Sequence, residues 1–255
     1  MDNNFDVIVI GSGPGGYVCA IRSAQLGLKT ACVEMRKTLG GTCLNVGCIP
    51  SKSLLNASEM YHKSQKEFDS LGIEISNIKL NLSKMMRNKE KSVLTLTKGI
   101  EFLFKKNKVT FIKGFASFKS KNIIIVTDTD QKEKTIESKN TIIATGSLPV
   151  SLPGIEFDEK HILSSTGALS LSNVPNKMII VGGGYIGLEM GSVWSRLGTD
   201  VQVIEFLDHI TPGMDKEISS EFMKILKKQG INFNLKTKVD SISKNNDRVI
   251  VKTAD

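Results

Sequence analysis

Cysteine is scarce in this chain of 255 residues, and long apolar runs are missing. Four cysteines are too few for the disulfide scaffold of a small secreted protein. No apolar run approaches the roughly 18 residues that a membrane-spanning helix needs. The first residues, MDNNFDVIVIG, lead directly into an apolar strand and show no basic or Arg/Ser-rich leader. A hydrophobic fraction of 40% predicts a packed core. From the lack of a membrane-spanning run and of a leader, we expect a soluble, cytoplasmic protein.

The excess of positive charge is confined to one part of the chain. Residues 62–140 carry 17 basic and 9 acidic side chains, whereas the remainder holds 17 of each, so the net charge of +8 arises in that segment. Its lysines are scattered singly, and the segment contains no nucleic-acid-binding motif. We therefore expect a solvated lysine-rich surface without a nucleic-acid partner. A structural DNA-binding role is the alternative that the charge alone suggests.

One unit of sequence occurs twice. The first copy is FDVIVIGSGPGGYVCAIRSAQLGLKTACVE, and the second is KMIIVGGGYIGLEMGSVWSRLGTDVQVIE. Each copy predicts a buried strand, a glycine turn, a helix that ends at Gly27 or Gly198, and a second strand. A shift of 171 residues superimposes three glycines and a final acid without a gap: Gly11 on Gly182, Gly13 on Gly184, Gly16 on Gly187, and Glu34 on Glu205.

This order of elements is typical of a Rossmann-like dinucleotide-binding unit. The first glycine permits a tight turn, the second lets the backbone approach a pyrophosphate, and the third allows close helix–strand packing. The phosphates would meet unpaired N–H groups at the helix N-terminus, and the acid would accept hydrogen bonds from ribose hydroxyls. Two units predict two such sites. Phe206, Leu207 and Asp208 follow Glu205 and offer no cation for a 2′-phosphate, so the second site should prefer NAD to NADP.

The segment LGGTCLNVGCIPSK carries Cys43 and Cys48 behind the first unit. Five residues of a regular helix rise about 7.5 Å, which exceeds the ~7 Å over which two Cα atoms can be bridged by a disulfide. A bond between these cysteines would therefore require a distorted turn, which Gly47 and Pro50 could supply.

Three interpretations of this cysteine pair differ in plausibility. A zinc site is disfavoured, because no second cysteine pair exists and the histidines lie in unrelated contexts: His62, His161 and His209. We therefore expect no metal. Two structural thiols, like those expected at Cys19 and Cys32 within apolar segments, remain an alternative. The functional interpretation is a redox-active dithiol beside a nucleotide cofactor.

The residues around the pair resemble a known family. GGTCLNVGCIPSK, placed behind a first glycine turn, is similar to the redox-disulfide segment of the flavoprotein disulfide reductases. It is nearer to their dihydrolipoamide dehydrogenase branch than to glutathione or mercuric reductase. GYIGLEMGSVWSRLG in the second copy, SSTGAL at 164–169 and TIIATGS at 141–147 support the same resemblance, which covers essentially the whole chain.

The resemblance implies a set of site residues. FAD would contact Gly11, Gly13, Gly16, Glu34, Thr42, Lys52, Gly114, Thr145, Gly146 and Ser147. NAD would contact Gly182, Gly183, Gly184, Tyr185, Ile186, Gly187, Glu205 and Val239. The implied catalytic residues are Cys43, Cys48, and a pair formed by Lys52 and Glu189 near the reactive edge of the flavin, where a cation would stabilise the reduced ring.

The implied activity is the oxidation of dihydrolipoamide on a lipoyl domain of a 2-oxo acid dehydrogenase complex. Electrons would pass through the Cys43–Cys48 disulfide and FAD to NAD⁺. Another disulfide or mercuric reductase of the family, and a non-catalytic nucleotide-binding remnant, are the alternatives. Family members are nearly twice as long and form homodimers, in which an interface domain donates a catalytic His–Glu pair that no histidine here matches. We therefore expect the isolated chain to bind FAD weakly or not at all and to turn over slowly.

The resemblance also implies an α/β architecture of two Rossmann-like units, the second inserted into the first and truncated at its C-terminal end. We place an incomplete FAD-binding domain at 1–150, with a β-meander at about 109–140. An incomplete NAD-binding domain follows at 151–255, and the interface domain is absent on this interpretation. Residues 57–104 predict helical segments alternating with loops, and residues 109–126 predict strands around Gly114.

Overall fold

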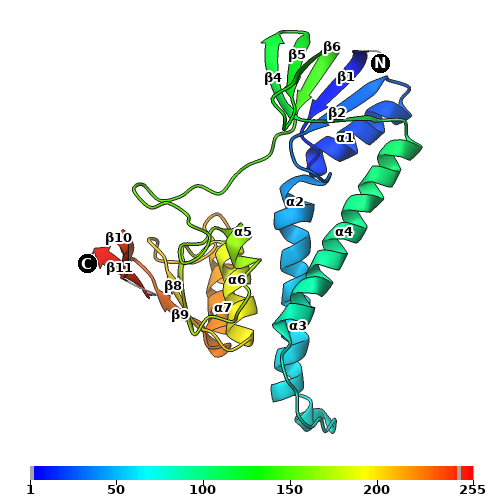
Figure 1. Cartoon of the computed structure of the whole chain (residues 1–255). Coiled ribbons are helices and arrows are strands. Elements are labelled where there is room, and N and C mark those ends of the chain that lie inside the picture. Colours follow the sequence, from blue (N-terminus) through cyan, green and yellow to red (C-terminus); the bar gives the residue numbers. More distant parts are fainter. Residues whose placement is uncertain (1–2, 246–247, 255) are drawn as a thin grey trace. The chain divides into compact units, whose positions relative to one another are not determined.

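The chain divides into two compact units, each with its own parallel strands (Figure 1). The computed structural model describes residues 3–245 and 248–254. The first unit comprises Met1–Pro50 and Glu90–Leu148, and the second comprises Ser51–Lys89 and Pro149–Asp255. Helices α3 (Cys48–Lys66) and α4 (Leu82–Lys106) carry the chain from one unit to the other, with the short 3-10 helix η1 (Asp69–Leu71) between them.

The first unit holds a six-stranded sheet in the order β3-β2-β1-β6-β5-β4. Strand β1 pairs in parallel with β2 and β6, and β2 with β3, whereas β5 pairs antiparallel with β4 and β6. Two helices, α1 (Pro14–Gln25) and α2 (Gly41–Val46), belong to the same unit. The strand bounds are β1 (Asn4–Ile10), β2 (Thr30–Glu34), β3 (Thr110–Lys113), β4 (Phe115–Ser120), β5 (Ile123–Thr127) and β6 (Glu133–Ile143).

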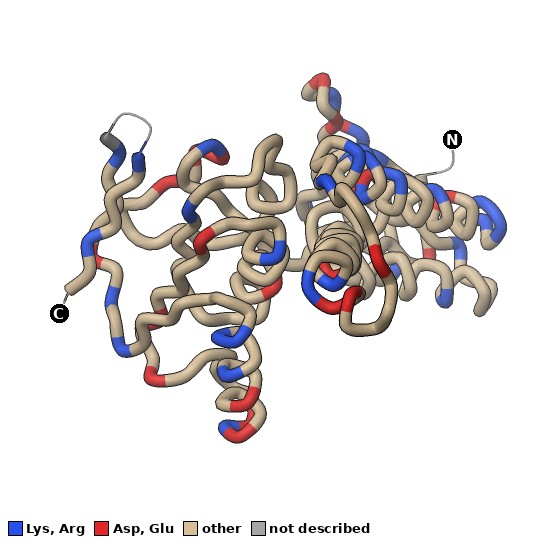
Figure 2. The backbone as a smooth tube through the Cα atoms, turned by 90° about the horizontal axis from the view of Figure 1, so that it is seen from below, with Lys and Arg blue, Asp and Glu red and all other residues tan. Residues whose placement is uncertain are grey.

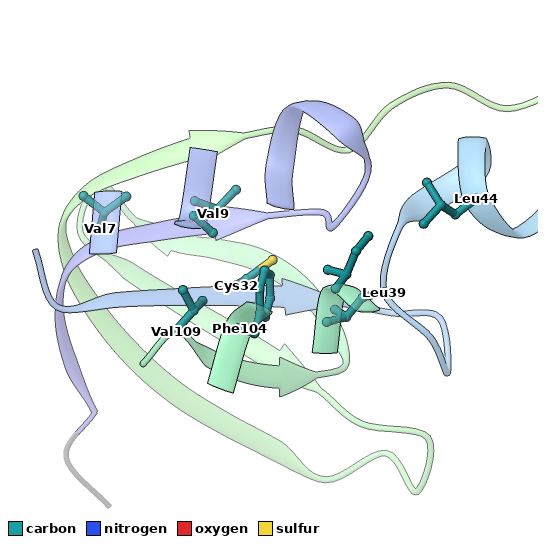
Figure 3. Packing of buried hydrophobic residues seen from close by; sticks show 9 residues of the cluster. Val7, Val9, Cys32, Leu39, Leu44, Phe104 and Val109 are labelled. Carbon is teal, nitrogen blue, oxygen red and sulfur yellow. The ribbon is translucent and has the colours of Figure 1, made fainter. Parts of the chain in front are cut away.

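Strand β1 is buried on both faces, as its continuous apolar run predicts. Val7 and Val9 pack with Cys32 of β2 and with residues of α1 and α4 on one side (Figure 3). Ile8 and Ile10 belong to a second cluster with residues of β5 and β6. Side chains of the antiparallel strands thus cover the face of β1 that the helices leave open.

The second unit repeats the parallel arrangement with three strands in the order β7-β8-β9. These are β7 (Lys177–Val181), β8 (Asp200–Ile204) and β9 (Asn232–Asn234), and an antiparallel hairpin of β10 (Lys238–Asn245) and β11 (Arg248–Ala254) follows. The helices are α5 (Ser165–Ala168), α6 (Tyr185–Arg196) and α7 (Lys216–Lys228). Fully buried Val201 and Val203 of β8 pack against α6 and α7. The Rossmann-like α/β class predicted from the repeat is confirmed.

The observed units differ from the predicted domain boundaries in two places. Residues 51–89, predicted within a first domain of 1–150, belong to the second unit, because fully buried Leu54 packs in one cluster with Trp194 and Met190 of α6. The antiparallel meander begins at Phe115, later than the predicted start at about 109, because β3 pairs in parallel with β2. The strands predicted on either side of Gly114 are present.

Basic side chains are spaced along the chain. Lys91, Lys98 and Lys105 of α4 are exposed, and Figure 2 shows basic positions separated by neutral and acidic ones. This spacing agrees with a solvated lysine-rich surface. None of the helices in the part of the chain that the structure describes has the length and apolar character needed to cross a bilayer.

Candidate functional site

Two glycine turns of the same geometry connect β1 to α1 and β7 to α6. Gly11 and Gly182 have left-handed φ angles of +99° and +103°, which glycine adopts without the penalty that a Cβ atom brings. The amide of Gly11 donates a 2.8 Å hydrogen bond to the carbonyl of Val33, and the amide of Gly182 donates one of the same length to the carbonyl of Ile204. The sequence repeat is therefore also a repeat of backbone geometry.

The second and third glycines of each turn have opposite surroundings. A Cβ atom on Gly16 would lie 1.8 Å from the carbonyl oxygen of the first glycine, and one on Gly187 would lie 3.0 Å from the equivalent oxygen. The third glycine therefore lets the helix pack against its turn. A Cβ atom on Gly184 would meet no atom within 4 Å, and one on Gly13 would meet only a Cα atom 3.9 Å away. The second glycine thus borders open space, where a phosphate group could approach the backbone.

The helices that follow the turns present uncapped N-termini. Gly13 and Gly184 are the N-cap residues of α1 and α6, so no side chain caps either helix, and neither first turn contains an acidic residue. The N–H groups and the positive end of each helix dipole remain available to an anion. Tyr185 and Ile186, two predicted NAD contacts, open α6 and are exposed. Both turns fit the pyrophosphate of a dinucleotide.

The two predicted ribose-binding acids hold the turns. Glu34 Oε2 accepts hydrogen bonds from the amide and the hydroxyl of Ser12 at 2.9 and 2.7 Å, and its Oε1 accepts one from the Arg36 amide at 2.8 Å. Glu205 accepts from the amides of Gly183 at 2.5 Å and Leu207 at 2.7 Å. A carboxylate has about four acceptor positions. Each acid therefore keeps capacity for a ribose hydroxyl while it fixes the loop.

The cysteine segment starts against the first glycine turn. A Cβ atom on Gly41, the first residue of α2, would lie 2.4 Å from the Cα atom of Gly13. Cys43 follows in α2 and packs, partly buried, against the core of the first unit. Thr42, a predicted FAD contact, lies between Gly41 and Cys43 in the same helix. The structure thus brings Thr42 and Cys43 next to the turn predicted to bind FAD.

A break in the helix separates the two cysteines, the kind of distortion that a disulfide between them would require. Helix α2 ends at Val46, Gly47 lies outside both helices, and α3 begins at Cys48. The backbone of Gly47 lies so close to the preceding helix that a Cβ atom there would be 2.9 Å from the Thr42 carbonyl oxygen. Pro50, the other residue predicted to distort the helix, lies in the first turn of α3. Backbone N–H groups have no partner within the helix at this position, so a proline there costs no hydrogen bond. Both cysteines are thiols in the structure.

The predicted pairing of Lys52 with Glu189 is present within the second unit. Lys52 Nζ lies 2.5 Å from Glu189 Oε1, and the hydroxyl of Ser51 donates a 2.5 Å hydrogen bond to Glu189 Oε2. Each oxygen of the carboxylate therefore has its own donor from α3. Sequence reasoning missed Ser51, although its position directly before Lys52 was the available signal.

The remaining predicted contacts lie in three places: after β6, after β3 and near the start of β10. In the first unit, a Cβ atom on Gly11 would lie 3.1 Å from the Cα atom of Thr145, so the turn Thr145–Ser147, which contains Gly146, lies against the first glycine turn. Gly114 follows β3, and its amide donates to the Glu34 carbonyl at 2.9 Å. In the second unit, Val239 belongs to β10, just after Thr237, whose amide donates to the Glu205 carbonyl at 2.9 Å. Gly114 therefore lies beside the Glu34 backbone, residues 145–147 lie beside the first glycine turn, and Val239 lies two residues after a direct neighbour of the Glu205 backbone.

The histidines do not form a metal site. Among the described residues, no group of three His, Cys, Asp or Glu side chains could hold a metal ion. His209 Nδ1 lies 2.6 Å from Asp208, and this hydrogen bond lowers the pKa of the Asp208 carboxyl. His161 lies 3.9 Å from Asp158. Both histidines therefore have local acidic neighbours.

Cys32 differs from the predicted redox pair in its surroundings. Burial, reinforced by the nearby Glu34 and Cys19, raises the pKa of the Cys32 thiol from 9.0 to about 12. Below pH 9 the thiol keeps its proton in the folded and the unfolded chain. Between pH 9 and about pH 12 only the unfolded chain ionises it, so the free energy of unfolding falls across this window.

Thiol labelling should separate these cysteines. The thiolate is the species that alkylating reagents attack, so folded Cys32 should react with iodoacetamide at pH 8 at least ~100-fold more slowly than exposed Cys48. Peptide mapping by mass spectrometry measures both rates in one sample. Urea should remove the difference, and equal rates in the folded chain would contradict the assigned burial of Cys32.

Comparison with known proteins agrees with this geometry. The model of the pyridine nucleotide-disulphide oxidoreductase family matches residues 5–255. Similar curated proteins include the mitochondrial dihydrolipoyl dehydrogenases of Pisum sativum, 54% identical over 244 residues, and Schizosaccharomyces pombe, 56% identical over 251 residues. A leghemoglobin reductase of Vigna unguiculata is 54% identical over 244 residues. The matches to the Pisum and Vigna proteins each cover 96% of this chain, and the match to the Schizosaccharomyces protein covers 98%. The chain spans about half the length of these curated relatives: 49% of the Pisum and Schizosaccharomyces proteins and 47% of the Vigna protein.

A solved structure supports the same assignment. The HOCl-induced flavoprotein disulfide reductase RclA from Escherichia coli, solved as a Cu(II) complex, superimposes with a TM-score of 0.82 at 26% identity. The match covers 98% of this chain and 53% of that one. The resemblance inferred from the cysteine segment and the repeat is therefore confirmed along nearly the whole sequence. The chain belongs to the pyridine nucleotide-disulphide oxidoreductase family.

Proposed function

We propose that this chain is the dinucleotide-binding portion of a dihydrolipoyl dehydrogenase, which oxidises dihydrolipoamide and passes two electrons through Cys43 and Cys48 to FAD and NAD⁺. The observation that carries the proposal is the break at Gly47, which sets the two cysteines on successive helices, the first of which starts against the first glycine turn. Identities of 54% and 56% to two dihydrolipoyl dehydrogenases, over about half of each, support this activity for the complete protein.

The two units would hold different dinucleotides. FAD suits the first unit, because its glycine turn lies beside the cysteine segment and the turn Thr145–Ser147. NAD suits the second, because the carboxylate of Glu205 would repel the 2′-phosphate of NADP. FAD, when bound, supplies a two-electron acceptor that regenerates the cysteine disulfide and delivers the electrons to NAD⁺. Lys52 and Glu189 are assigned to the flavin edge on the family resemblance.

The chemistry of the chain's own residues is thiol–disulfide exchange. A substrate thiolate attacks Sγ of Cys43, the Cys43–Cys48 bond breaks, and Cys48 leaves as a thiolate. Its place at the start of α3 favours the negative charge, because the helix dipole is positive there. The second substrate thiolate then attacks the substrate sulfur of the mixed disulfide, which closes the lipoamide ring and releases Cys43. Each exchange breaks one S–S bond and forms one, and the two substrate protons pass to solvent or to a base.

The proposed partner is dihydrolipoamide carried on a lipoyl domain of a 2-oxo acid dehydrogenase complex, and the complete enzyme would act as a homodimer. For this chain by itself we keep the expectation of weak FAD binding and slow turnover. The chain spans about half the length of these relatives.

The test follows the thiols and the flavin of the purified wild-type chain. The Cys43–Cys48 disulfide is first formed with a mild oxidant, and dihydrolipoamide is then added with FAD and NAD⁺ present. We expect two thiols to be regained and the added FAD to bleach, with slow formation of NADH. A bridge that resists excess dihydrolipoamide would refute the proposal. Thiol release without any change in FAD would place the defect of this chain in its flavin site, whereas the absence of both thiol release and FAD reduction would favour a non-catalytic remnant. Reduction of oxidised glutathione or Hg²⁺ by NADPH would assign a sister reductase.

A further inference from the structure

Thr211 has a backbone conformation that its side chain disfavours. Its φ angle is +50°, in the left-handed region, although it is β-branched and 5% exposed. Among the described residues outside glycine, the other positive φ angles belong to Asn77, Lys108, Gln131, Glu159 and Lys236, none of them β-branched. Strain of this kind persists only where the surroundings hold it, and it concentrates at ligand sites.

Two hydroxyl contacts hold Thr211 in place. Its Oγ1 donates a 2.8 Å hydrogen bond to the Ile210 carbonyl and lies 2.8 Å from the hydroxyl of Ser219 in α7. Ser219 is 1% exposed, so water does not compete for this contact. The side chain is thus fixed from both directions.

The backbone of Thr211 acts on the second glycine turn. Its amide donates a 2.8 Å hydrogen bond to the carbonyl of Gly183, while the amide of Gly183 donates to Glu205 Oε2 at 2.5 Å. Both polar backbone groups of Gly183 are therefore held, which fixes the peptide planes on either side of it. These planes set the direction of the N–H groups that follow at the start of α6.

The first unit contains the same pair of hydrogen bonds at the equivalent positions, an arrangement that we call the clamp. The shift of 171 residues relates Thr211 to Gly40, whose amide donates to the Ser12 carbonyl at 2.9 Å. The amide of Ser12 in turn donates to Glu34 Oε2 at 2.9 Å. Gly40 is also left-handed, with φ of +101°. The clamp therefore recurs in two units whose local sequences differ but whose glycine turns agree, and the second unit builds it from a strained residue.

We propose that Thr211 is a positioning residue of the nucleotide site in the second unit. Its left-handed backbone holds Gly183 so that the N–H groups of α6 are directed at a pyrophosphate. This inference rests on the proposed binding of NAD by that unit. Gly40 makes the equivalent bond in the first unit without a Cβ atom, so what matters at Thr211 is that its two hydroxyl contacts hold the left-handed backbone in place. Loss of these contacts should weaken binding without weakening the fold.

The test compares Thr211→Gly with Lys108→Gly in the full chain. Both replace a residue at positive φ, but Lys108 belongs to the first unit and Thr211 to the second. Binding of NADH, ADP-ribose and adenosine is measured by calorimetry, and unfolding of the second unit by the fluorescence of the single tryptophan, Trp194. Thr211→Gly keeps the amide that donates to Gly183 but loses both hydroxyl contacts that hold residue 211 in place. We therefore expect affinity for NADH and ADP-ribose to fall about tenfold, because the freed backbone holds Gly183 for less of the time. Adenosine, which has no phosphate, should bind within about twofold of wild type, and the Trp194 transition should not move to lower temperature.

Each other outcome has a defined meaning. Lys108→Gly should bind all three ligands as wild type does. Ser219→Ala removes one restraint on Thr211 and should weaken NADH binding about threefold, which tests the clamp should Thr211→Gly unfold. Unchanged NADH binding by Thr211→Gly and Ser219→Ala would overturn the role of Thr211 but leave the NAD site standing. So would a loss of affinity for adenosine equal to that for NADH. Failure of the wild-type chain to bind NADH would overturn the NAD site and this role with it.

Discussion

Replacing Gly16 with alanine should lower the free energy of unfolding of the first unit by about 3 kcal/mol or more and abolish any affinity for FAD. The added Cβ atom would lie 1.8 Å from the carbonyl oxygen of Gly11 and 2.8 Å from its carbonyl carbon. No rotamer change can relieve this contact, because both partners are backbone atoms of the glycine turn. The helix would have to move away from β1, and the N–H groups that face the pyrophosphate would move with it.

The neighbouring Gly15 provides a matched control. It lies in the same turn of α1, but a Cβ atom there would meet no atom within 4 Å. Gly15→Ala should therefore remain within ~0.5 kcal/mol of wild type. Circular dichroism follows the unfolding of both units, whereas the fluorescence of Trp194 follows the second unit. Gly16→Ala should therefore change the unfolding curve measured by circular dichroism and leave the curve measured by Trp194 fluorescence unchanged. Equal stability of the two variants would show that the close approach of α1 to its turn is not required.

The glycine turns were predictable from sequence because their constraints are local. A strand, a left-handed residue, a close helix contact and a terminal acid recur at fixed spacing, and each position has one geometric requirement. The sequence linked a break between Cys43 and Cys48 to a disulfide, since a regular helix places two such residues too far apart to be bridged. The pairing of Lys52 with Glu189, which lie 137 positions apart, came from the family resemblance and not from any local pattern.

The sequence alone does not show that residues 51–89 pack with the second compact unit. An amphipathic helix shows which of its faces is buried but not which core buries it. Leu54 packs with Trp194, and Glu59 pairs with Arg196 at 2.7 Å, so tertiary contacts with α6 decide the assignment. The sequence did not distinguish the parallel strand β3 from the antiparallel strands that follow it, because short strands look alike whether they pair in parallel or antiparallel. Thr211 gave no signal, since no propensity predicts a strained residue.

Serine at either Cys43 or Cys48 should reduce the transfer of electrons from dihydrolipoamide by on the order of 10³-fold or more. A hydroxyl cannot form the S–S bond that stores the electron pair, so one cysteine alone can only form a mixed disulfide with the substrate. The expected signature is chemical as well as kinetic. Mild oxidation of wild type should form an intramolecular disulfide and so remove two thiols. In either serine variant this disulfide cannot form, and no thiols should be lost to it.

Cys19→Ser is the matched control for this experiment. Cys19 lies in α1, partly buried against the same core as Cys43, but outside the segment between Gly41 and α3. Its replacement should leave both the loss of two thiols and the rate of their recovery within about twofold of wild type. Because the thiol count needs no bound FAD, it separates two causes of low activity, a cysteine pair unable to exchange and a flavin site that is incomplete. Retention of the intramolecular bond in the Cys48→Ser variant would mean that Cys43 pairs with Cys19 or Cys32, and Cys48 would then have no place in the electron path.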